Sequence, residues 1–452
     1  MTSVLVSVQV RSLYSLAMWA AQPLLRRKLA RRGVQEPGYL EAVEERFGHY
    51  GADTPPSSGW VWVHAVSMGE TRAAAILVKQ LRRQLPGMRL LLTHGTATGR
   101  AEGRSLLQPG DVQVWQPWDT PGAVRRFLAQ FRPAIGILME TEIWPNMVAL
   151  CREQGVPLVL ANARLNTHSL HKAQRVGWLA RPAYAGLAAV WAQSQADADR
   201  LAQLDAPVQG VFGNVKFDAT PDAAQLARGQ GWRAGLGRPV VLLASAREGE
   251  EAEFLAALKL FIPPAHAVPE QVAPDLIAKI PVNGVQWLIV PRHPQRFDEV
   301  AALVQQHGFS LSRRSTWGQG ADSVAPAAAD IWLGDSMGEM ALYYGLGHVA
   351  LLGGSFAPLG GQNLIEAAAC GCPVVTGPSV FNFQEAATLA QQAGAAFPVP
   401  SMARGVQLAV ELAQDATRLT QACVAAEQFA AAHRGAAERT ARAVQAMLSS
   451  RV

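Results

Sequence analysis

Short runs of apolar residues alternate along most of the chain with longer segments that have the periodicity of helices. The runs typical of strands lie at residues 60–65, 89–93, 112–115, 134–139, 157–161 and 189–192, and then at 240–244, 287–290, 331–333, 349–352 and 374–376. Helical segments such as 71–85 and 121–131 separate them. Because the strands are continuously apolar and alternate with helices, the pattern predicts α/β domains whose parallel sheets are covered on both faces.

The two sets of strands predict two doubly wound, Rossmann-like domains that face each other across a cleft. Residues 218–239 between them are polar and rich in glycine and show no strand pattern, which predicts a linker. We therefore expect one domain at 33–217 and a second at 240–452, closed by alanine-rich helices at its C-terminal end. A stretch with five prolines, 263–284, interrupts the second domain and is typical of a surface insertion.

The N-terminal segment, residues 1–32, has a different character. Residues 4–25 are mostly apolar, but Gln9, Arg11 and Gln22 make them a poor transmembrane span. Basic residues follow the apolar stretch instead of preceding it, which argues against a cleaved signal peptide and favours a membrane anchor with the protein on the cytoplasmic side. Tyr14 and Trp19 suit a helix that lies in the membrane surface. The alternative is an N-terminal helix that packs on its own domain.

The formal net charge of +5 first suggests a nucleic-acid-binding protein. However, five basic residues lie within the heptad 26–32, and without them the chain has 40 − 5 = 35 basic residues against 35 acidic ones. The remaining charge is balanced. The composition therefore argues against a nucleic-acid partner and assigns the excess charge to the segment that follows the apolar stretch.

Polar residues that could carry chemistry follow several strands of the first domain. Glu70 lies at the start of a helix after strand 60–65, where a plain helix-start carboxylate is the alternative. Glu140 and Glu142 follow strand 134–139 and should point to opposite faces if the strand continues, so that only one faces the cleft. Pro145 suits the next helix start and gives Thr141 or Glu142 a capping role, which leaves Glu140 for chemistry. Lys216 precedes the linker, and it could equally be an exposed linker lysine.

Three strand ends of the second domain suggest a nucleotide site. Arg292 follows strand 287–290 and can hold phosphate oxygens in a bidentate fork. Residues 334–340 follow the next strand. Residues 353–366 hold four glycines within nine positions and then open a helix, so that backbone N–H groups could approach an anion and Glu366 could accept hydrogen bonds from a ribose. The sequence shows no cluster of metal ligands, which favours a transfer that needs no metal.

Seven motifs, in order over nearly the whole chain, resemble the Kdo (3-deoxy-D-manno-octulosonic acid) transferases of lipid A biosynthesis, glycosyltransferase family 30, which have the GT-B fold. The motifs are HAVSMGE at 64–70, METEIWPN at 139–146, NARL at 162–165, GNVKFD at 213–218, VPRHPQRF at 290–297, GDSMGEM at 334–340 and GGQNLIEAAACGCPVV at 360–375. The resemblance implies transfer of Kdo from CMP-Kdo, as donor substrate, to lipid IVA, with inversion and without an essential metal or other cofactor.

The resemblance also implies roles for individual residues. Glu70 would be the general base, and Glu140 and Lys216 would stabilise the transition state. The residues that would bind CMP are Pro291, Arg292, Met337, Gly338, Glu339, Asn363, Leu364, Ile365 and Glu366. Arg247 stands where the family usually has His, and Gln362 and Leu364 replace a common His and Pro. Another GT-B sugar-nucleotide enzyme, such as a lipid-A disaccharide synthase or a UDP-sugar epimerase, is the alternative.

Overall fold

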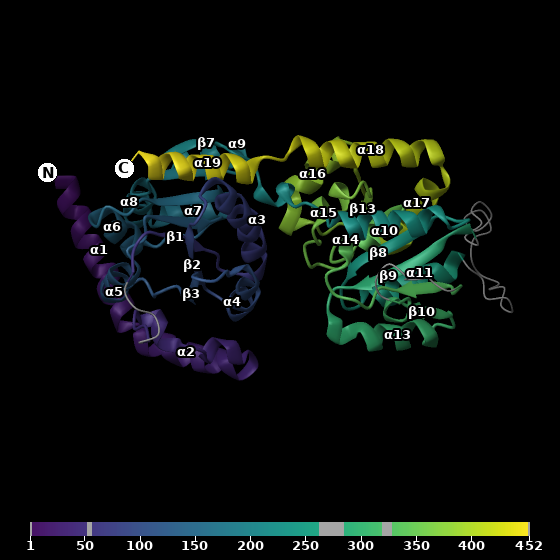
Figure 1. Cartoon of the computed structure of the whole chain (residues 1–452), viewed down its shortest axis with the longest axis horizontal. Coiled ribbons are helices and arrows are strands. Elements are labelled where there is room, and N and C mark those ends of the chain that lie inside the picture. Colours follow the sequence, from purple (N-terminus) through teal and green to yellow (C-terminus); the bar gives the residue numbers. More distant parts are fainter. Residues whose placement is uncertain (1, 52–56, 262–283, 319–327, 451–452) are drawn as a thin grey trace. The chain divides into compact units, whose positions relative to one another are not determined.

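The computed structural model describes residues 2–51, 57–261, 284–318 and 328–450 (Figure 1). The chain divides into two compact units, which are described separately. Unit 1 consists of Met1–Asp218 and Arg434–Val452, and unit 2 consists of Ala219–His433. The insertion predicted at 263–284 lies, except for Gly284, outside the described residues.

Unit 1 is built on a parallel sheet of seven strands. In spatial order they are β3 (Val112–Trp115), β2 (Arg89–His94), β1 (Trp60–His64), β4 (Ile135–Met139), β5 (Leu158–Ala163), β6 (Ala189–Ala192) and β7 (Val208–Val211). Side chains of β1 alternate between two separate apolar cores, with Trp60 and Trp62 in one and Val61 and Val63 in the other. Both faces of the sheet are therefore covered, as its continuously apolar strands predict.

The helices of unit 1 cover the two faces of this sheet. They are α1 (Thr2–Ala20), α2 (Gln22–Gln35), α3 (Met68–Gln84), α4 (Ala97–Gly103), α5 (Pro121–Phe131), α6 (Pro145–Glu153), α7 (Thr167–Arg175), α8 (Gly177–Ala185), α9 (Gln195–Ala202) and α19 (Ala436–Ser449), with short 3₁₀ helices at Pro37–Leu40, Val43–Phe47, Arg104–Leu106 and Val215–Asp218 (η4). Ser67, Thr120 and Ser194 accept a hydrogen bond from the first turns of α3, α5 and α9. These N-caps fix where the helices begin after their strands.

Unit 2 repeats the architecture with a second parallel sheet of seven strands. In spatial order they are β10 (Leu311–Arg313), β11 (Ile331–Leu333), β9 (Gln286–Pro291), β8 (Val240–Ala246), β12 (Val349–Leu352), β13 (Val374–Thr376) and β14 (Ala396–Pro398). Its helices are α10 (Ala223–Ala234), α11 (Glu250–Phe261), α13 (Phe297–Gln306), α14 (Met340–Leu346), α15 (Leu364–Ala369), α16 (Gln384–Gln392), α17 (Met402–Gln414) and α18 (Ala416–Ala432), with 3₁₀ helices at Pro294–Arg296, Arg314–Thr316 and Phe381–Phe383. All eleven predicted strands are present in the two sheets, and β7, β10 and β14 are additional.

Two predicted domain boundaries differ from the structure. The segment 218–239 is not an open linker, because it contains α10, which packs on α14 of unit 2. The C-terminal end of the chain does not belong wholly to the second domain either, because α19 packs on α3 of unit 1. The Asp218 carboxylate accepts hydrogen bonds from the backbone N–H groups of Gly435 and Ala437, and so fixes the start of α19.

The N-terminal helix α1 contacts its own domain from Arg11 onward. Arg11 forms an ion pair with Glu153 of α6 at 2.8 Å, and the Tyr14 hydroxyl donates to Asp119 at 2.9 Å. The alternative of a helix that packs on its own domain is therefore correct for this part of α1. Within the described part of the chain, no helix combines the length and the apolar character that crossing a membrane requires.

Candidate active site

The strand order of unit 1 places the first two candidate loops side by side. The order reverses between β1 and β4, which pair directly, and ligands of such sheets bind beyond the carboxyl ends of strands at this switch point. The loop after β1 carries Glu70, and the loop after β4 carries Glu140 and Glu142. Both loops were predicted from polar residues that follow apolar strands, and the strand order of the sheet brings the two loops together.

Glu70 lies in the first turn of α3 and is partly buried. Its carboxylate accepts hydrogen bonds from the Val66 N–H at 2.8 Å and from the Ser67 hydroxyl at 3.3 Å. Burial raises the pKa of Glu70 to about 7, the Val66 N–H lowers it, and the negative charges of Glu140 and Glu142 raise it further. A carboxyl with a pKa near neutrality can accept a proton at physiological pH much better than an ordinary one.

Glu140 is 2% exposed and lies between two cations. Lys216 Nζ is 3.0 Å from its Oε1, and Arg164 Nε is 2.8 Å from its Oε2. The buried carboxylate is thus paired at both oxygens, and the cluster of the three side chains carries a net positive charge. Lys216 is not an exposed linker lysine, because it is held at Glu140 on η4. Arg164 was not among the predicted site residues, although its motif, NARL, was recognised.

The strand geometry on which the expected alternation of Glu140 and Glu142 depends does not continue into this loop. Its φ is 61°, in the left-handed region, so the strand geometry ends at Met139. Glu140 and Glu142 therefore do not simply alternate between faces, and the charges of both act on Glu70. Left-handed non-glycine residues cost on the order of 1–3 kcal/mol and are common at functional sites.

The helix that follows this loop is not capped by Glu142 or Thr141 as suggested. Helix α6 begins at Pro145, as expected, but its N-cap residue, Trp144, gives no side-chain cap. The Asp119 carboxylate instead accepts hydrogen bonds from the N–H groups of Asn146 at 3.0 Å and Met147 at 2.8 Å. Glu142 is therefore not used as a cap, and burial raises its pKa.

In unit 2, the predicted nucleotide-binding residues follow β9, β11 and β12. Pro291 ends β9, and the N–H of Arg292 donates to the Ala246 carbonyl at 2.9 Å. Met337 is 58% exposed and Gly338 has a φ of 76°, so this turn presents side chain and backbone to solvent. The Glu339 carboxylate accepts a hydrogen bond from Arg314 at 2.8 Å, which ties the turn to its own domain.

The glycine-rich loop after β12 is organised around a buried carboxylate. Glu250, which is 1% exposed, accepts hydrogen bonds from the N–H groups of Gly354 at 2.7 Å, Phe356 at 3.0 Å and Ala357 at 3.2 Å. It also accepts one from the N–H of Arg247 at 2.9 Å. These N–H groups face inward to a buried carboxylate. Glu250, which the sequence analysis did not select, therefore holds the loop in shape.

The start of α15 contains the last group of predicted residues. Asn363 is the N-cap, and its side chain accepts a hydrogen bond from the Ile365 N–H at 3.2 Å. Leu364 and Ile365 are fully buried. Glu366 lies one turn into the helix and is partly exposed. The assignment of these residues to CMP binding stays a prediction.

The two parallel α/β units resemble those of GT-B glycosyltransferases, and solved structures share this fold. The chain matches a glycosyltransferase from Rickettsia africae with a TM-score of 0.52 at 12% identity, covering 87% of this chain and 99% of that one. It matches a putative UDP-N-acetylglucosamine 2-epimerase from Listeria monocytogenes with a TM-score of 0.54 at 12% identity, covering 86% and 96%. At this identity the likeness concerns the fold alone.

Sequence comparison identifies the family within this class. Residues 41–219 match the family model described as 3-deoxy-D-manno-octulosonic-acid transferase (kdotransferase). The chain is 44% identical to the 3-deoxy-D-manno-octulosonic acid transferase of Bordetella pertussis over 442 residues, covering 96% of this chain and 99% of the relative. It is 32% identical to the transferase of Haemophilus influenzae, covering 89% and 90%. The chain belongs to the Kdo transferase family and is a glycosyltransferase of lipopolysaccharide biosynthesis, which disfavours the epimerase and disaccharide-synthase alternatives.

Proposed function

We propose that this chain transfers Kdo from CMP-Kdo to the hydroxyl of a lipid A precursor, lipid IVA, with Glu70 as the general base. The observation that carries this proposal is the raised pKa of Glu70, to about 7, beside a buried carboxylate held by two cations. Mass spectrometry of the product formed from purified protein, CMP-Kdo and lipid IVA tests it. A product without added Kdo contradicts it.

In the proposed reaction, the acceptor oxygen attacks the anomeric carbon of Kdo while the bond from that carbon to the CMP phosphate breaks. The acceptor hydroxyl becomes acidic as the new C–O bond forms, and the ionised Glu70 takes its proton. Attack from the face opposite CMP inverts the configuration. Glu70 becomes a neutral carboxylic acid, and the freed CMP carries the electron pair of the broken bond.

The charges of the site fit the charges that develop during this transfer. Positive charge builds on the sugar, where the Glu140 carboxylate is suited to stabilise it, and negative charge builds on the leaving phosphate. We assign Arg292 to the phosphate of bound CMP and Lys216 to the transition state, and no metal ion is needed for these roles. In the proposal, residues at the ends of β9, β11 and β12 bind the CMP part of the donor.

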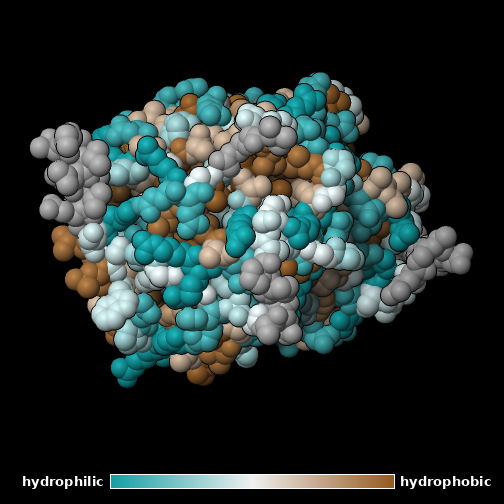
Figure 2. Space-filling model, turned by 60° about the vertical axis from the view of Figure 1, so that its left-hand side comes forward, coloured by the Kyte–Doolittle hydropathy of each residue, from teal (hydrophilic) through white to brown (hydrophobic). Residues whose placement is uncertain are grey.

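The N-terminal helices support a lipid acceptor and a place at the cytoplasmic face of the inner membrane. Leu13, Leu16 and Trp19 are three residues apart, so they share one side of α1, and 61–68% of each is exposed. The basic heptad 26–32 follows on α2. Figure 2 shows apolar side chains at the surface among polar ones. An amphipathic helix of this kind binds in the plane of a membrane surface, and each basic residue adds about 1 kcal/mol of attraction to anionic lipids.

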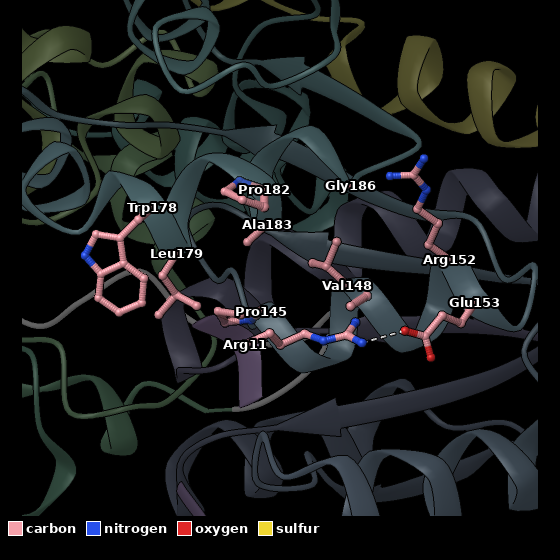
Figure 3. Close-up of a pocket in the computed structure, with 11 residues that line it drawn as sticks. Arg11, Pro145, Val148, Arg152, Glu153, Trp178, Leu179, Pro182, Ala183 and Gly186 are labelled. Carbon is pink, nitrogen blue, oxygen red and sulfur yellow. Dashed lines mark hydrogen bonds and ion pairs between the residues drawn. The ribbon is translucent and has the colours of Figure 1, made fainter. Parts of the chain in front are cut away.

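A cavity next to α1 gives the acyl part of such an acceptor a place on unit 1. It has a volume of about 410 Å³ and lies among α1, α6 and α8. In Figure 3, Trp178 and Leu179 lie on one side, Val148 in the middle, and Arg152 on the other side. The wall is apolar, and its edge holds Arg152 and the ion pair of Arg11 with Glu153, which leaves one cation in excess for an anionic headgroup attached to an acyl chain. Helix α6 starts directly after the Glu140–Glu142 loop, and its first residue, Pro145, lines the cavity.

A further inference from the structure

We propose that Asn162 is a positioning residue that sets Lys216 against Glu140. This inference rests on the proposed role of Lys216 in the transition state. Asn162 lies in β5, is 2% exposed, and has no charge of its own. Its side-chain Oδ1 accepts a hydrogen bond at 3.0 Å from the N–H of Val215, the residue directly before Lys216. The bond joins two segments that are 53 residues apart in the chain.

The backbone of Lys216 is fixed at two consecutive N–H groups. Asn162 holds the N–H of Val215, and the side chain of Asn214 accepts the N–H of Lys216 itself at 3.0 Å. Val215 is fully buried in the core of unit 1, so η4 has little freedom to shift. The long lysine side chain therefore starts from a defined point, and its Nζ reaches Glu140 Oε1 at 3.0 Å.

The conformation of Asn162 explains why an asparagine serves this role. Its φ is 51°, which asparagine and aspartate tolerate better than other residues with a Cβ. The left-handed turn coincides with a register shift between β5 and β6, and the Asn162 carbonyl accepts a hydrogen bond from the Gln193 side chain at 2.8 Å. Glycine would tolerate the turn but lacks the acceptor. Aspartate would keep the acceptor but add a negative charge beside Glu140.

The end of β5 also holds the backbone of Glu140, which is the ion-pair partner of Lys216. The N–H of Glu140 donates to the Ala161 carbonyl, and the Glu140 carbonyl accepts the N–H of Arg164, both at 3.1 Å. Asn162 lies between Ala161 and Arg164 in the chain. The short segment 161–164 thus binds the backbone of Glu140 at both of its ends and the backbone next to Lys216 in its middle. A disturbance at Asn162 should therefore move Lys216 relative to Glu140.

The test is a double-mutant cycle on the full-length protein. We expect Asn162→Gly to lower kcat about 10- to 100-fold, because small displacements of catalytic groups have effects of this size. The KM values for donor and acceptor, and the Kd for CMP, should change less than about twofold, as groups acting only in the transition state leave them unchanged. In a Lys216→Ala background, Asn162→Gly should lower kcat by less than about a further twofold, because its effect passes through Lys216.

Other outcomes overturn the proposal in distinguishable ways. Multiplicative effects of the two substitutions would show that Asn162 contributes to structure or catalysis without Lys216. A normal kcat for Lys216→Ala would remove the transition-state role of Lys216 and with it this inference, while product formation by the unaltered protein would still support Kdo transfer. Should Asn162→Gly not fold, Asn162→Asp decides: because aspartate keeps the acceptor for the Val215 N–H, its kcat should fall less than that of Lys216→Ala, and the fall comes from the charge added beside Glu140. A loss as large as that of Lys216→Ala contradicts the proposal.

Discussion

Replacing the proposed base, Glu70, by glutamine should produce an inactive protein that is more stable than the original at alkaline pH. The substitution keeps the shape of the side chain and an oxygen that can accept from the Val66 N–H. It removes a carboxyl whose folded-state pKa is raised from 4.5 to about 7, chiefly by burial. Activity and stability should thus change in opposite directions, as expected where a buried group is retained for function.

The size of the stability effect follows from the pKa. Each pKa unit corresponds to 1.36 kcal/mol, so ionising Glu70 costs the folded state roughly 3 kcal/mol. Because the folded pKa is higher than the unfolded one, this cost is absent below pH 4.5 and is complete above about pH 7. Relative to the original protein, Glu70→Gln should gain on the order of 5 °C or more in Tm at pH 8, and little at pH 4.5.

Scanning calorimetry at both pH values measures Tm. CMP titration and product analysis, both at pH 8, measure nucleotide binding and activity. CMP binding should persist in Glu70→Gln, since the proposed nucleotide residues lie in unit 2. The control is Glu438→Gln, which alters an exposed ion pair with Arg442 on α19 and should change neither activity nor stability. Full activity of Glu70→Gln, or a Tm difference that does not grow with pH, would refute the reasoning.

Further predictions concern pH, the nucleotide, the acyl cavity and the membrane surface. The kcat/KM of the original protein should rise about tenfold from pH 6 to pH 8, as ionised Glu70 increases from about a tenth to about nine tenths; a flat profile argues against this base. Arg292→Ala should weaken CMP binding about tenfold or more, and tighter binding of UDP than of CMP would contradict the donor assignment. Ala149 of α6 lines the cavity, so Ala149→Trp should raise the KM for lipid IVA but not the KM for a deacylated acceptor. The control, Ala129→Trp on the exposed side of α5, should raise neither KM. Replacing Leu16 and Trp19 by serine should reduce binding to anionic vesicles, and unchanged sedimentation with them argues against this surface.

The interior strands were predictable because burial on both faces leaves a continuous apolar run. The three strands that the pattern missed, β7, β10 and β14, all lie at sheet edges. They are three or four residues long and only partly buried, so their composition does not differ from that of loops. An edge strand is defined by a neighbour that offers free backbone groups, and this neighbour is not visible in the strand's own residues.

Helix α10 was taken for a linker because glycine usually marks a loop. A Cβ on Gly229 would lie 2.2 Å from the Leu342 carbonyl oxygen, so this glycine allows α10 and α14 to pack backbone against backbone. Helix α19 was assigned to the wrong domain because its composition was also ambiguous. Its alanines Ala436, Ala437 and Ala441 form a small apolar face that could pack on either domain, and only the structure shows that unit 1 receives it.

The candidate site was predictable where a functional side chain follows an apolar strand, and less so where a residue acts through the backbone. Glu70, Glu140 and Lys216 stood out as polar residues at strand ends or before the linker. Asn162 and Glu250 did not, because each is buried and acts on backbone N–H groups that the fold brings from far along the chain. Arg164 is intermediate, since its pairing with Glu140 depends on β4 and β5 being neighbours.

Several energetically costly features of unit 1 lie at the proposed reaction centre. Glu140 and Asn162 both have left-handed backbones, and they lie at the ends of two paired strands. Glu70 and Glu142 are carboxyls whose pKa values burial raises. Each feature opposes folding, and none is required by the sheet itself. An ion pair with a mainly structural role would not need a neighbouring carboxyl whose pKa is near neutrality. The combination is what a proton-accepting transfer site requires: a base near neutrality, a fixed anion, and cations held at defined positions beside it.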